Sequence, residues 1–269
     1  MNLMNKTLFK ATLKANWVIG LFIILMLLIY MIVSITMFDP DNAETIEGML
    51  KMMPEGMIKA FGFNNLGTDL TGYLANYHYG FIFLLFPMLY SAIVANRLIA
   101  KHVDNNSMSY LLTTPNTRIK IATTQAIYLV SSIAVIFIVV IGISIALSES
   151  MFSGLLNINK FLALNLVTYL TTIVVSGIGF FFSCFFNETR NSLAFGAGVP
   201  LIFIVIRMLT AISEKMAWLK YFSIYSFINI EEILRSNAYV IRSSSILLVI
   251  GVALYTTAII IFNRRSLSI

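Results

Sequence analysis

Six long stretches almost free of charged residues run through this 269-residue sequence. Each is long enough to cross a hydrocarbon core of about 30 Å as a helix that rises about 1.5 Å per residue. Only 11% of the residues are charged and 59% are hydrophobic, which excludes a disordered chain, a nucleic-acid-binding domain and an ordinary cytosolic enzyme. The sequence therefore predicts an all-α membrane protein, with residues 1–269 forming a single transmembrane domain. The predicted spans lie near residues 17–38, 76–96, 121–148, 161–187, 191–212 and 243–263.

Residues 1–16, which precede the first span, combine basic and apolar side chains. Lys6, Lys10 and Lys14 alternate with leucines, and this pattern predicts an amphipathic helix that lies in the cytoplasmic membrane interface. A plain basic flank of the first span is the alternative interpretation. The first span is too long for the apolar region of a cleaved signal peptide, and no small-residue cleavage site follows it. We therefore expect this span to remain in the mature protein.

Basic residues collect on one side of the six-span arrangement. The N-terminal segment, residues 97–120, the connection between spans four and five, and the C-terminal tail carry ten Lys and Arg residues against two acidic residues. The other connections, which include predicted outer loops at 39–75 and 213–242, carry seven basic and ten acidic residues. Because basic connections stay in the cytoplasm, this distribution predicts that both termini and residues 97–120 are cytoplasmic.

The two outer loops are not featureless. Residues 49–61 are apolar with sparse charges and predict a short surface helix that is broken near Pro54 and Gly56. Residues 217–233 are rich in aromatic side chains but too charged for a seventh span. An interfacial or re-entrant helix is the better interpretation of the second segment.

The chemistry-bearing residues are few and poorly placed for catalysis. None of the twelve Asp and Glu residues falls inside the apolar centre of a span, where ion-coupled carriers place ionisable groups. Two histidines and the single Cys184 are too few for a metal cluster, and no Gly-x-x-x-x-Gly-Lys-Ser/Thr loop for ATP is present. We therefore expect no catalytic residue, metal or cofactor in this chain, which is not an enzyme, and we expect its driving energy to come from another protein.

Three residues inside the spans are candidates for a transport path or an outer gate. Pro87 and Pro200 each remove a helix hydrogen bond and favour a kink, in the second and fifth spans respectively. Arg207 lies toward the outer end of the fifth span, where it either snorkels to the interface or faces an outer cavity. Gly179-x-x-x-Ser183 permits a close helix approach, and ordinary membrane packing is the alternative for all these features.

The connection at residues 97–120 carries the most specific pattern. Ser107 is expected to cap a short helix that Pro115 ends, and Asn116 or Thr117 then caps the third span. The apolar residues of that short helix are Met108, Leu111 and Leu112. A short, partly apolar helix flanked by charge suits docking into a groove of another protein.

These residues resemble the coupling region of the membrane subunits of type-2 ABC exporters. That family has an interfacial helix, six spans and a cytoplasmic coupling helix between spans two and three. Its coupling region reads as an acidic stretch, then Gly-Ser or Gly-Thr, then Leu-Leu-x-x-Pro-x-Ser/Thr-Arg. His102 stands where Glu is common and Asn106 where Gly is common, while residues 262–267 are similar to the family's closing aromatic-basic-basic segment. The matching positions are Asp104, Ser107, Leu111, Leu112, Pro115, Thr117 and Arg118.

The resemblance implies partners, a location and a function. It implies a separate ATP-binding cassette ATPase subunit on the coupling helix, with ATP and Mg²⁺ on that partner, and a second permease copy in a two-plus-two complex. Asp104 and Arg118 would contact the ATPase or support the region beside it. The location implied is a bacterial cell membrane, among its lipids, with no nucleic acid involved.

The expected cargo is hydrophobic or amphipathic peptides such as toxins and antimicrobial peptides, as in the phenol-soluble modulin exporters, so the chain would serve peptide export and antimicrobial resistance. Export of lipids or drugs is an alternative. A scaffold or sensor that docks a soluble partner without transport is another alternative.

Overall fold

The computed structural model describes residues 4–38, 53–61, 69–113 and 116–266, and these residues form helices with no β-strand among them. Six of the helices are long and apolar enough to cross a membrane, which confirms the predicted all-α, six-span fold. They are α1 (Lys6–Thr36), α5 with α6 (Ile82–Leu98 and Ala100–Asp104), α8 (Arg118–Met151), α9 (Ile158–Phe185), α10 (Thr189–Ile212) and α12 (Asn237–Arg264). The shorter elements are α3 (Glu55–Phe61), α4 (Leu70–Tyr79), α7 (Ser107–Thr113), η2 (Glu214–Phe222), η3 (Ile224–Phe227) and α11 (Ile230–Arg235).

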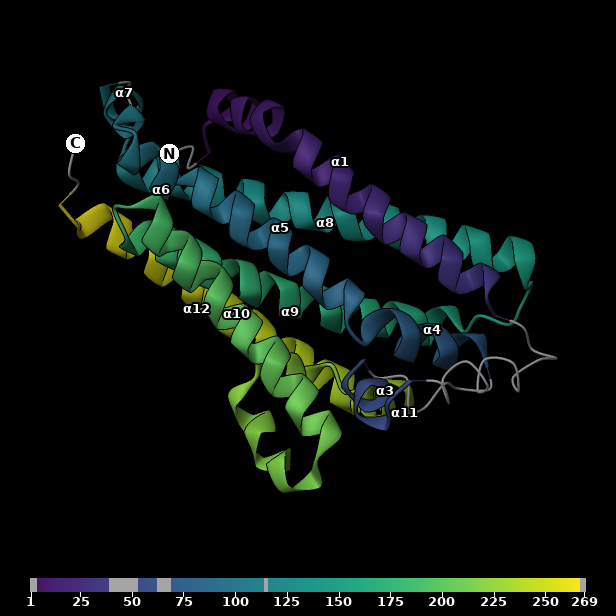
Figure 1. Cartoon of the computed structure of the whole chain (residues 1–269). Helices are drawn as coiled ribbons and strands as arrows, with labels where there is room; N and C mark the ends of the chain where they lie inside the picture. The colour runs from purple at the N-terminus through teal and green to yellow at the C-terminus, as the bar shows by residue number, and fades with distance from the viewer. Residues whose placement is uncertain (1–3, 39–52, 62–68, 114–115, 267–269) are drawn as a thin grey trace.

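The long helices run side by side in an elongated bundle (Figure 1). Both chain termini lie at the same end of this bundle as α6 and α7, and we call it the α7 end. The α3, α4 and α11 helices lie toward the opposite end, which we call the far end. An even number of spans returns the chain to the side of the membrane on which it began, so both termini are expected at one end of the bundle.

The centre of the bundle is α9, which packs against α12, α5, α10 and α8. Its inward residues include several threonines and serines, and the hydroxyls of Thr168, Thr171 and Ser176 each donate to a carbonyl of the preceding turn. These bonds satisfy the hydroxyls within α9, as an apolar surrounding requires, and Ser176 also lies 2.8 Å from the hydroxyl of Tyr255 on α12. Hydroxyl side chains can therefore line the core of this bundle.

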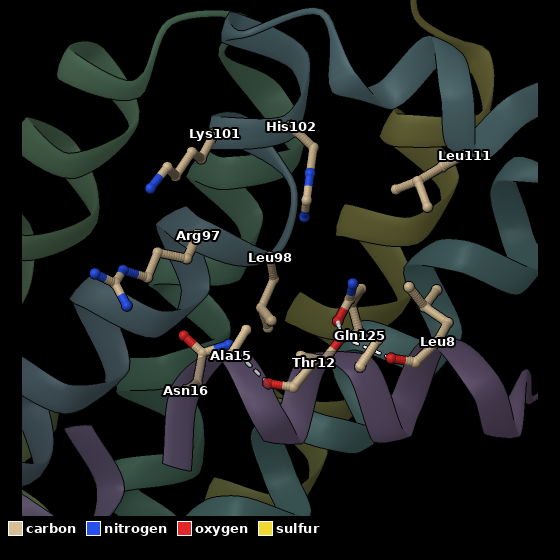
Figure 2. A pocket seen from close by; sticks show the side chains of 11 residues that line it. Leu8, Thr12, Ala15, Asn16, Arg97, Leu98, Lys101, His102, Leu111 and Gln125 are labelled. Atoms are coloured by element: carbon tan, nitrogen blue, oxygen red, sulfur yellow. Dashed lines mark hydrogen bonds between the residues drawn. The ribbon is translucent and has the colours of Figure 1, made fainter. Parts of the chain in front are cut away.

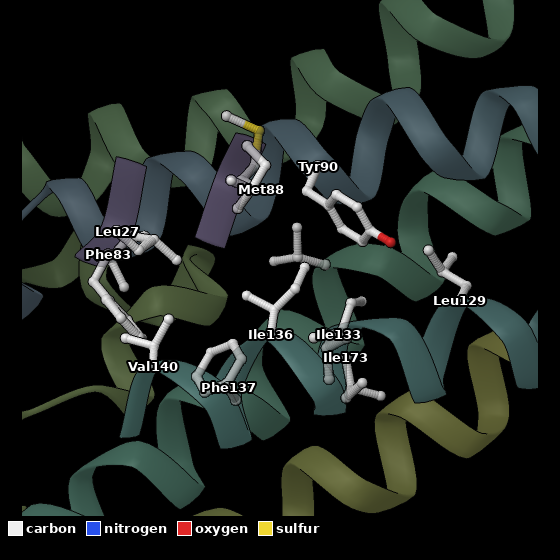
Figure 3. Close-up of a cluster of buried hydrophobic side chains, with 14 of the residues drawn as sticks. Leu27, Phe83, Met88, Tyr90, Leu129, Ile133, Ile136, Phe137, Val140 and Ile173 are labelled. Carbon is white, nitrogen blue, oxygen red and sulfur yellow. The ribbon is translucent and has the colours of Figure 1, made fainter. Parts of the chain in front are cut away.

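Large apolar side chains fill the space between α1, α5, α8 and α9 (Figure 3). Leu27, Phe83 and Leu129 are fully buried there, and Phe83 meets Phe137 edge to face with ring centroids 5.3 Å apart. The outward faces of α8 and α12 remain apolar, and Ile138 and Val249 are each 68% exposed. A bundle that is apolar both inside and outside is typical of a membrane protein.

Glycines bring α5, α9 and α10 unusually close together. A Cβ atom on Gly196 would lie 3.3 Å from the Cα of Gly179, and one on Gly179 would lie 3.3 Å from the Cβ of Ala95. Small residues allow such contacts between membrane helices because backbones can approach closely. The close approach predicted at Gly179 is therefore confirmed.

The predicted N-terminal helix is present, but it is continuous with the first span. Residues 1–16 are predicted to form an interfacial helix, and α1 runs without a break from Lys6 to Thr36. Asn5 caps this helix by accepting the N–H of Leu8, and neither glycine nor proline interrupts it before Gly20. Thr12 and Asn16 are buried, so the first turns pack on the bundle.

The second span also differs from its prediction of a helix over residues 76–96. The helix is interrupted at Gly80 and Phe81, so the span begins at Ile82. Residues 70–79, which fall largely in the predicted outer loop 39–75, form the buried helix α4, where Leu70 and Tyr79 are fully buried. Asp69 accepts the N–H of Gly72 and caps α4.

Two predicted surface elements can be compared in part with the structure. Of the predicted helix at 49–61, residues 49–52 lie outside the described residues, while α3 begins directly after Pro54 and includes Gly56. The predicted loop 213–242 contains η2, η3 and α11, while its last residues belong to α12. Trp218, Tyr221 and Phe222 on η2 are exposed, which is typical of an aromatic membrane-interface segment.

Candidate coupling site

The turn between α6 and α7 has a left-handed residue at its centre. Asn106 has φ of 59°, a conformation that glycine and asparagine adopt most readily. This explains why asparagine stands at a position where the coupling pattern commonly has glycine. The departure therefore preserves the turn that starts α7.

The side chain of Ser107 joins α6 to α7. Its hydroxyl donates to Oδ1 of Asn105 at 2.6 Å and lies 2.8 Å from Nδ1 of His102. The N–H of Ser107 also donates to Oδ1 of Asn105, at 3.1 Å. Ser107 is thus the first residue of α7 and not its N-cap. Both its N–H and its hydroxyl donate to Asn105, whereas the hydroxyl of an N-cap serine would accept an N–H from the first turn of the helix.

The two faces of α7 have different surroundings. Met108 is fully buried, and Leu111 and Leu112 are half-buried against the core. Successive helix residues turn by about 100°, so these three share one face and Tyr110 lies on the opposite one. Tyr110 is 78% exposed. The predicted docking leucines therefore face the bundle. The sequence interpretation missed Tyr110, although the rotation of about 100° per residue places it on the opposite, exposed face.

The start of α8 follows the prediction. Thr117 precedes the helix with an extended backbone, and its hydroxyl accepts the N–H of Lys120 at 3.2 Å. This is the hydrogen bond of an N-cap threonine. Pro115, which is expected to end the short helix, lies outside the described residues.

Asp104 and Arg118 hold the coupling region to two distant helices. Oδ2 of Asp104 accepts the N–H of Thr189 at 3.2 Å, at the start of α10, where the helix dipole favours a negative charge. Nη1 of Arg118 donates to the carbonyl of Arg265 at 2.7 Å, directly after α12. The structure therefore joins the predicted coupling motif to the basic tail segment that the sequence pattern also singled out.

Further hydrogen bonds attach the region to α9 and α1. The N–H of Ala100 donates to Oγ of Ser183 at 3.0 Å, which links α6 to α9. Nδ2 of Asn5 donates to Oδ1 of Asn116 at 2.9 Å, which links the start of α1 to the end of the connection at residues 97–120. The coupling region is therefore hydrogen-bonded to α1, α9, α10 and the end of α12.

The region lies over a buried cationic group. All three guanidinium nitrogens of Arg265 are buried without a hydrogen-bond partner among the described residues, and burial lowers the pKa of this group. The guanidinium lies 5.6 Å from the ring centroid of Phe262, where a cation–π contact offsets part of the lost hydration.

A family model described as ABC-2 family transporter protein matches residues 3–267. The chain belongs to this family. A search of curated proteins and a search of solved structures each returned no match. The chain is thus the membrane component of an ABC transporter and a multi-pass membrane protein.

The three other candidate residues of this ABC-2 permease do not form one site with the coupling region. Pro87 is buried inside a continuous α5, and its carbonyl accepts the hydroxyl of Ser91 at 2.7 Å. Pro200 is buried inside a continuous α10. Arg207 lies near Tyr225 of η3, and its Nη1 is buried without a hydrogen-bond partner among the described residues. The helix is thus interrupted at Gly80 and Phe81, before the second span, and at Ile99, between α5 and α6, but not at Pro87.

Proposed function

We propose that this permease is the membrane subunit of an ATP-driven exporter, and that a separate ATP-binding cassette subunit docks on α7. The observation that carries the proposal is the position of α7, which stands at one end of the bundle with Tyr110 exposed. ABC-2 permeases typically work with an ATP-binding subunit. ATP and Mg²⁺ then belong to that partner, and this chain supplies no catalytic group.

The hydrogen bonds of the coupling region suggest how the partner's motion reaches the membrane. When the ATPase pair closes, α7 and α6 move as a unit that His102 and Ser107 hold together. Asp104 passes the displacement to α10, and Arg118 passes it to the end of α12. Packed helices respond to such a push by rigid-body rotation or sliding between discrete arrangements.

The proposed orientation places the α7 end in the cytoplasm of a bacterial cell. The ten basic and two acidic residues assigned to that side support this, as does the position of both termini beside α7 in Figure 1. Six spans make one half of a transport unit, so two copies of the permease pair with two ATPase subunits. Peptides of hydrophobic or amphipathic character are the proposed cargo, because the spans are rich in aromatic and methionine side chains that suit varied apolar ligands.

Copurification tests the docking helix. The tagged permease is purified from its native membrane, and the proteins that accompany it are identified by mass spectrometry. We expect an ATP-binding protein in near-equal amount, and about a tenfold weaker association for Tyr110→Ala, as for an exposed aromatic anchor. Tyr221→Ala is the matched control, because Tyr221 is 81% exposed on η2.

The outcomes separate the possibilities clearly. Equal recovery of the ATPase with Tyr110→Ala and with Tyr221→Ala would overturn the assignment of α7 as the docking helix. Recovery of the permease without an ATP-binding protein would favour a scaffold or sensor. Stimulation of the complex's ATPase activity by peptides, and not by lipids or drugs, would support the proposed cargo.

A further inference from the structure

Two neighbouring cavities lie beside α1, and only one of them has charged residues in its lining. That one, of about 400 Å³, lies at the α7 end, and Arg97, Lys101 and Gln125 line it together with apolar residues such as Leu98; we call it the polar cavity. The other, of about 370 Å³, is almost wholly apolar and is lined by residues that include Trp17 and Gly20. Both volumes are in the range of ligand-binding cavities.

Asn16 of α1 forms part of the wall of both cavities. It is only 4% exposed, its amide nitrogen donates to the carbonyl of Thr12 at 3.0 Å, and its Oδ1 is buried with no hydrogen-bond partner among the residues that the structure describes. A buried acceptor without a partner is unfavourable unless a ligand or a water molecule donates to it. The residue is therefore placed to accept a hydrogen bond from a ligand that occupies both cavities.

The polar cavity carries an excess of positive charge. Figure 2 shows Arg97 and Lys101 projecting in the same direction, on the side of the cavity where Asn16 lies. Neither makes an ion pair with another described residue. Asp104 lines a neighbouring cavity together with both cations, but it makes no ion pair with either, and its carboxylate accepts the N–H of Thr189. An anionic group in this cavity would thus meet two cations that lack a partner in the described chain.

The apolar cavity runs along α1 beside the polar cavity and continues into the membrane-spanning part of the helix. It reaches from Phe9 to Ile24, a distance of about 22 Å along the helix. Exposed apolar residues of α1 and α8 border it, among them Leu21 and Val135, so a chain can enter from the side. Tyr90 and Tyr128 form the inner wall.

We propose that the two cavities form a single binding site for an anionic phospholipid of the bilayer leaflet at the α7 end. The phosphate lies against Arg97 and Lys101, a headgroup hydroxyl donates to Oδ1 of Asn16, and one acyl chain occupies the apolar cavity. Basic cavities between membrane helices bind anionic lipid headgroups by this combination of charge and depth. Leu111 of α7 also lines the polar cavity, so the bound lipid supports the proposed docking helix from beneath.

Tryptophan fluorescence tests the site directly, because Trp17 lines the apolar cavity and the other tryptophan, Trp218, lies on η2. The full-length permease with Trp218→Phe is reconstituted in vesicles that contain brominated phosphatidylglycerol or brominated phosphatidylcholine. Competition between the lipids gives their relative binding constants at Trp17. We expect phosphatidylglycerol to be preferred on the order of tenfold, and soluble inorganic phosphate not to displace it.

Two pairs of variants locate the headgroup and the chain. The double substitution of Arg97→Gln and Lys101→Gln should abolish the preference for phosphatidylglycerol. Arg264→Gln, which removes an exposed charge at the α7 end, should preserve that preference. Gly20→Leu fills the apolar cavity, since a Cβ there lies 3.8 Å from Tyr90, and should reduce quenching by both lipids. Gly142→Leu places the same side chain in open space on α8 and is the control.

Several results would overturn the proposal. Equal binding of the two lipids by the unaltered site, or an equal loss of preference with Arg264→Gln, would exclude a specific headgroup site. Displacement by inorganic phosphate would indicate an anion site and not a lipid site. Unchanged quenching with Gly20→Leu would exclude the apolar cavity. The measurement uses the permease alone, so its outcome is independent of the proposed transport function.

Discussion

Replacement of Gly196 by alanine tests the close backbone contact between α9 and α10. The added Cβ would lie 3.3 Å from Cα and 3.6 Å from the carbonyl oxygen of Gly179, which are backbone atoms that cannot turn aside. The helices α9 and α10 would have to separate by a few tenths of an ångström. Gly198, two residues further along α10, would place the same Cβ in open space.

Both substitutions increase helix propensity by the same amount, so the difference between their unfolding free energies measures the cost of the contact between Gly196 and Gly179. Alanine is about 1 kcal/mol more favourable than glycine inside a helix, and Gly198→Ala is expected to stabilise the permease by about that amount. At Gly196 the same gain is opposed by overpacking, which costs about 1–3 kcal/mol. We therefore expect Gly196→Ala to be less stable than Gly198→Ala by about 1–3 kcal/mol.

Unfolding by sodium dodecyl sulfate in mixed micelles, followed by circular dichroism, measures this difference. The two variants share the same host helix and the same added atom, which removes most other contributions. If their unfolding free energies agree within about 0.5 kcal/mol, the two helices are not in the close contact that Gly179 and Gly196 make here.

Three further predictions concern other parts of the chain. Tyr79→Phe removes the buried 2.7 Å hydrogen bond to Oδ1 of Asn165 and should lower the unfolding free energy by about 1 kcal/mol in the same assay, whereas no change would mean that the bond contributes nothing. Thr117→Ala removes the cap of α8 at a cost of about 1 kcal/mol and should speed amide exchange in the first turn of α8 only, so exchange that is equally fast along the whole helix would contradict it. A cysteine in place of exposed Ser153, at the far end, should react in whole cells with a membrane-impermeant thiol reagent, and one in place of exposed Thr113 should not; the reverse pattern would overturn the proposed orientation.

The native thiol does not interfere with the last measurement. Cys184 is fully buried on α9, so an impermeant reagent does not reach it while the protein is folded. Labelling of the unaltered permease provides the background for both introduced cysteines.

The spans were predictable because crossing a membrane depends only on the length and the polarity of a continuous stretch of sequence. A charge-free run of sufficient length has few alternatives to a helix in lipid, since every backbone polar group must be satisfied within the segment. The ends were less well predicted, because α8 begins at Arg118 and α9 includes Lys160, charged residues that a run without charges leaves out. Charged side chains near a helix end extend toward the interface, so they do not mark where the helix stops.

Helix α4 shows what a search for apolar runs misses. Its sequence contains glycine, asparagine, histidine and tyrosines, and it reads as part of a loop. The surrounding helices bury it, and the N–H of Asn157 donates to Oγ1 of Thr71 at 2.8 Å. Tyr30 adds a bond to the carbonyl of Tyr77 at 3.2 Å. Tertiary packing makes this segment a core helix, although its composition does not.

The sequence by itself determined the six spans, the short helix after the second span and the threonine that caps the third, because each depends on residues close together in the chain. Only the tertiary structure decided what the coupling residues contact. Asp104 meets Thr189 and Arg118 meets Arg265 across separations of 85 and 147 residues. It also decided which face of α7 is covered, so that Tyr110 and not the adjacent leucines is left exposed. Such contacts arise from the way the helices pack against one another, and local sequence patterns carry no information about that.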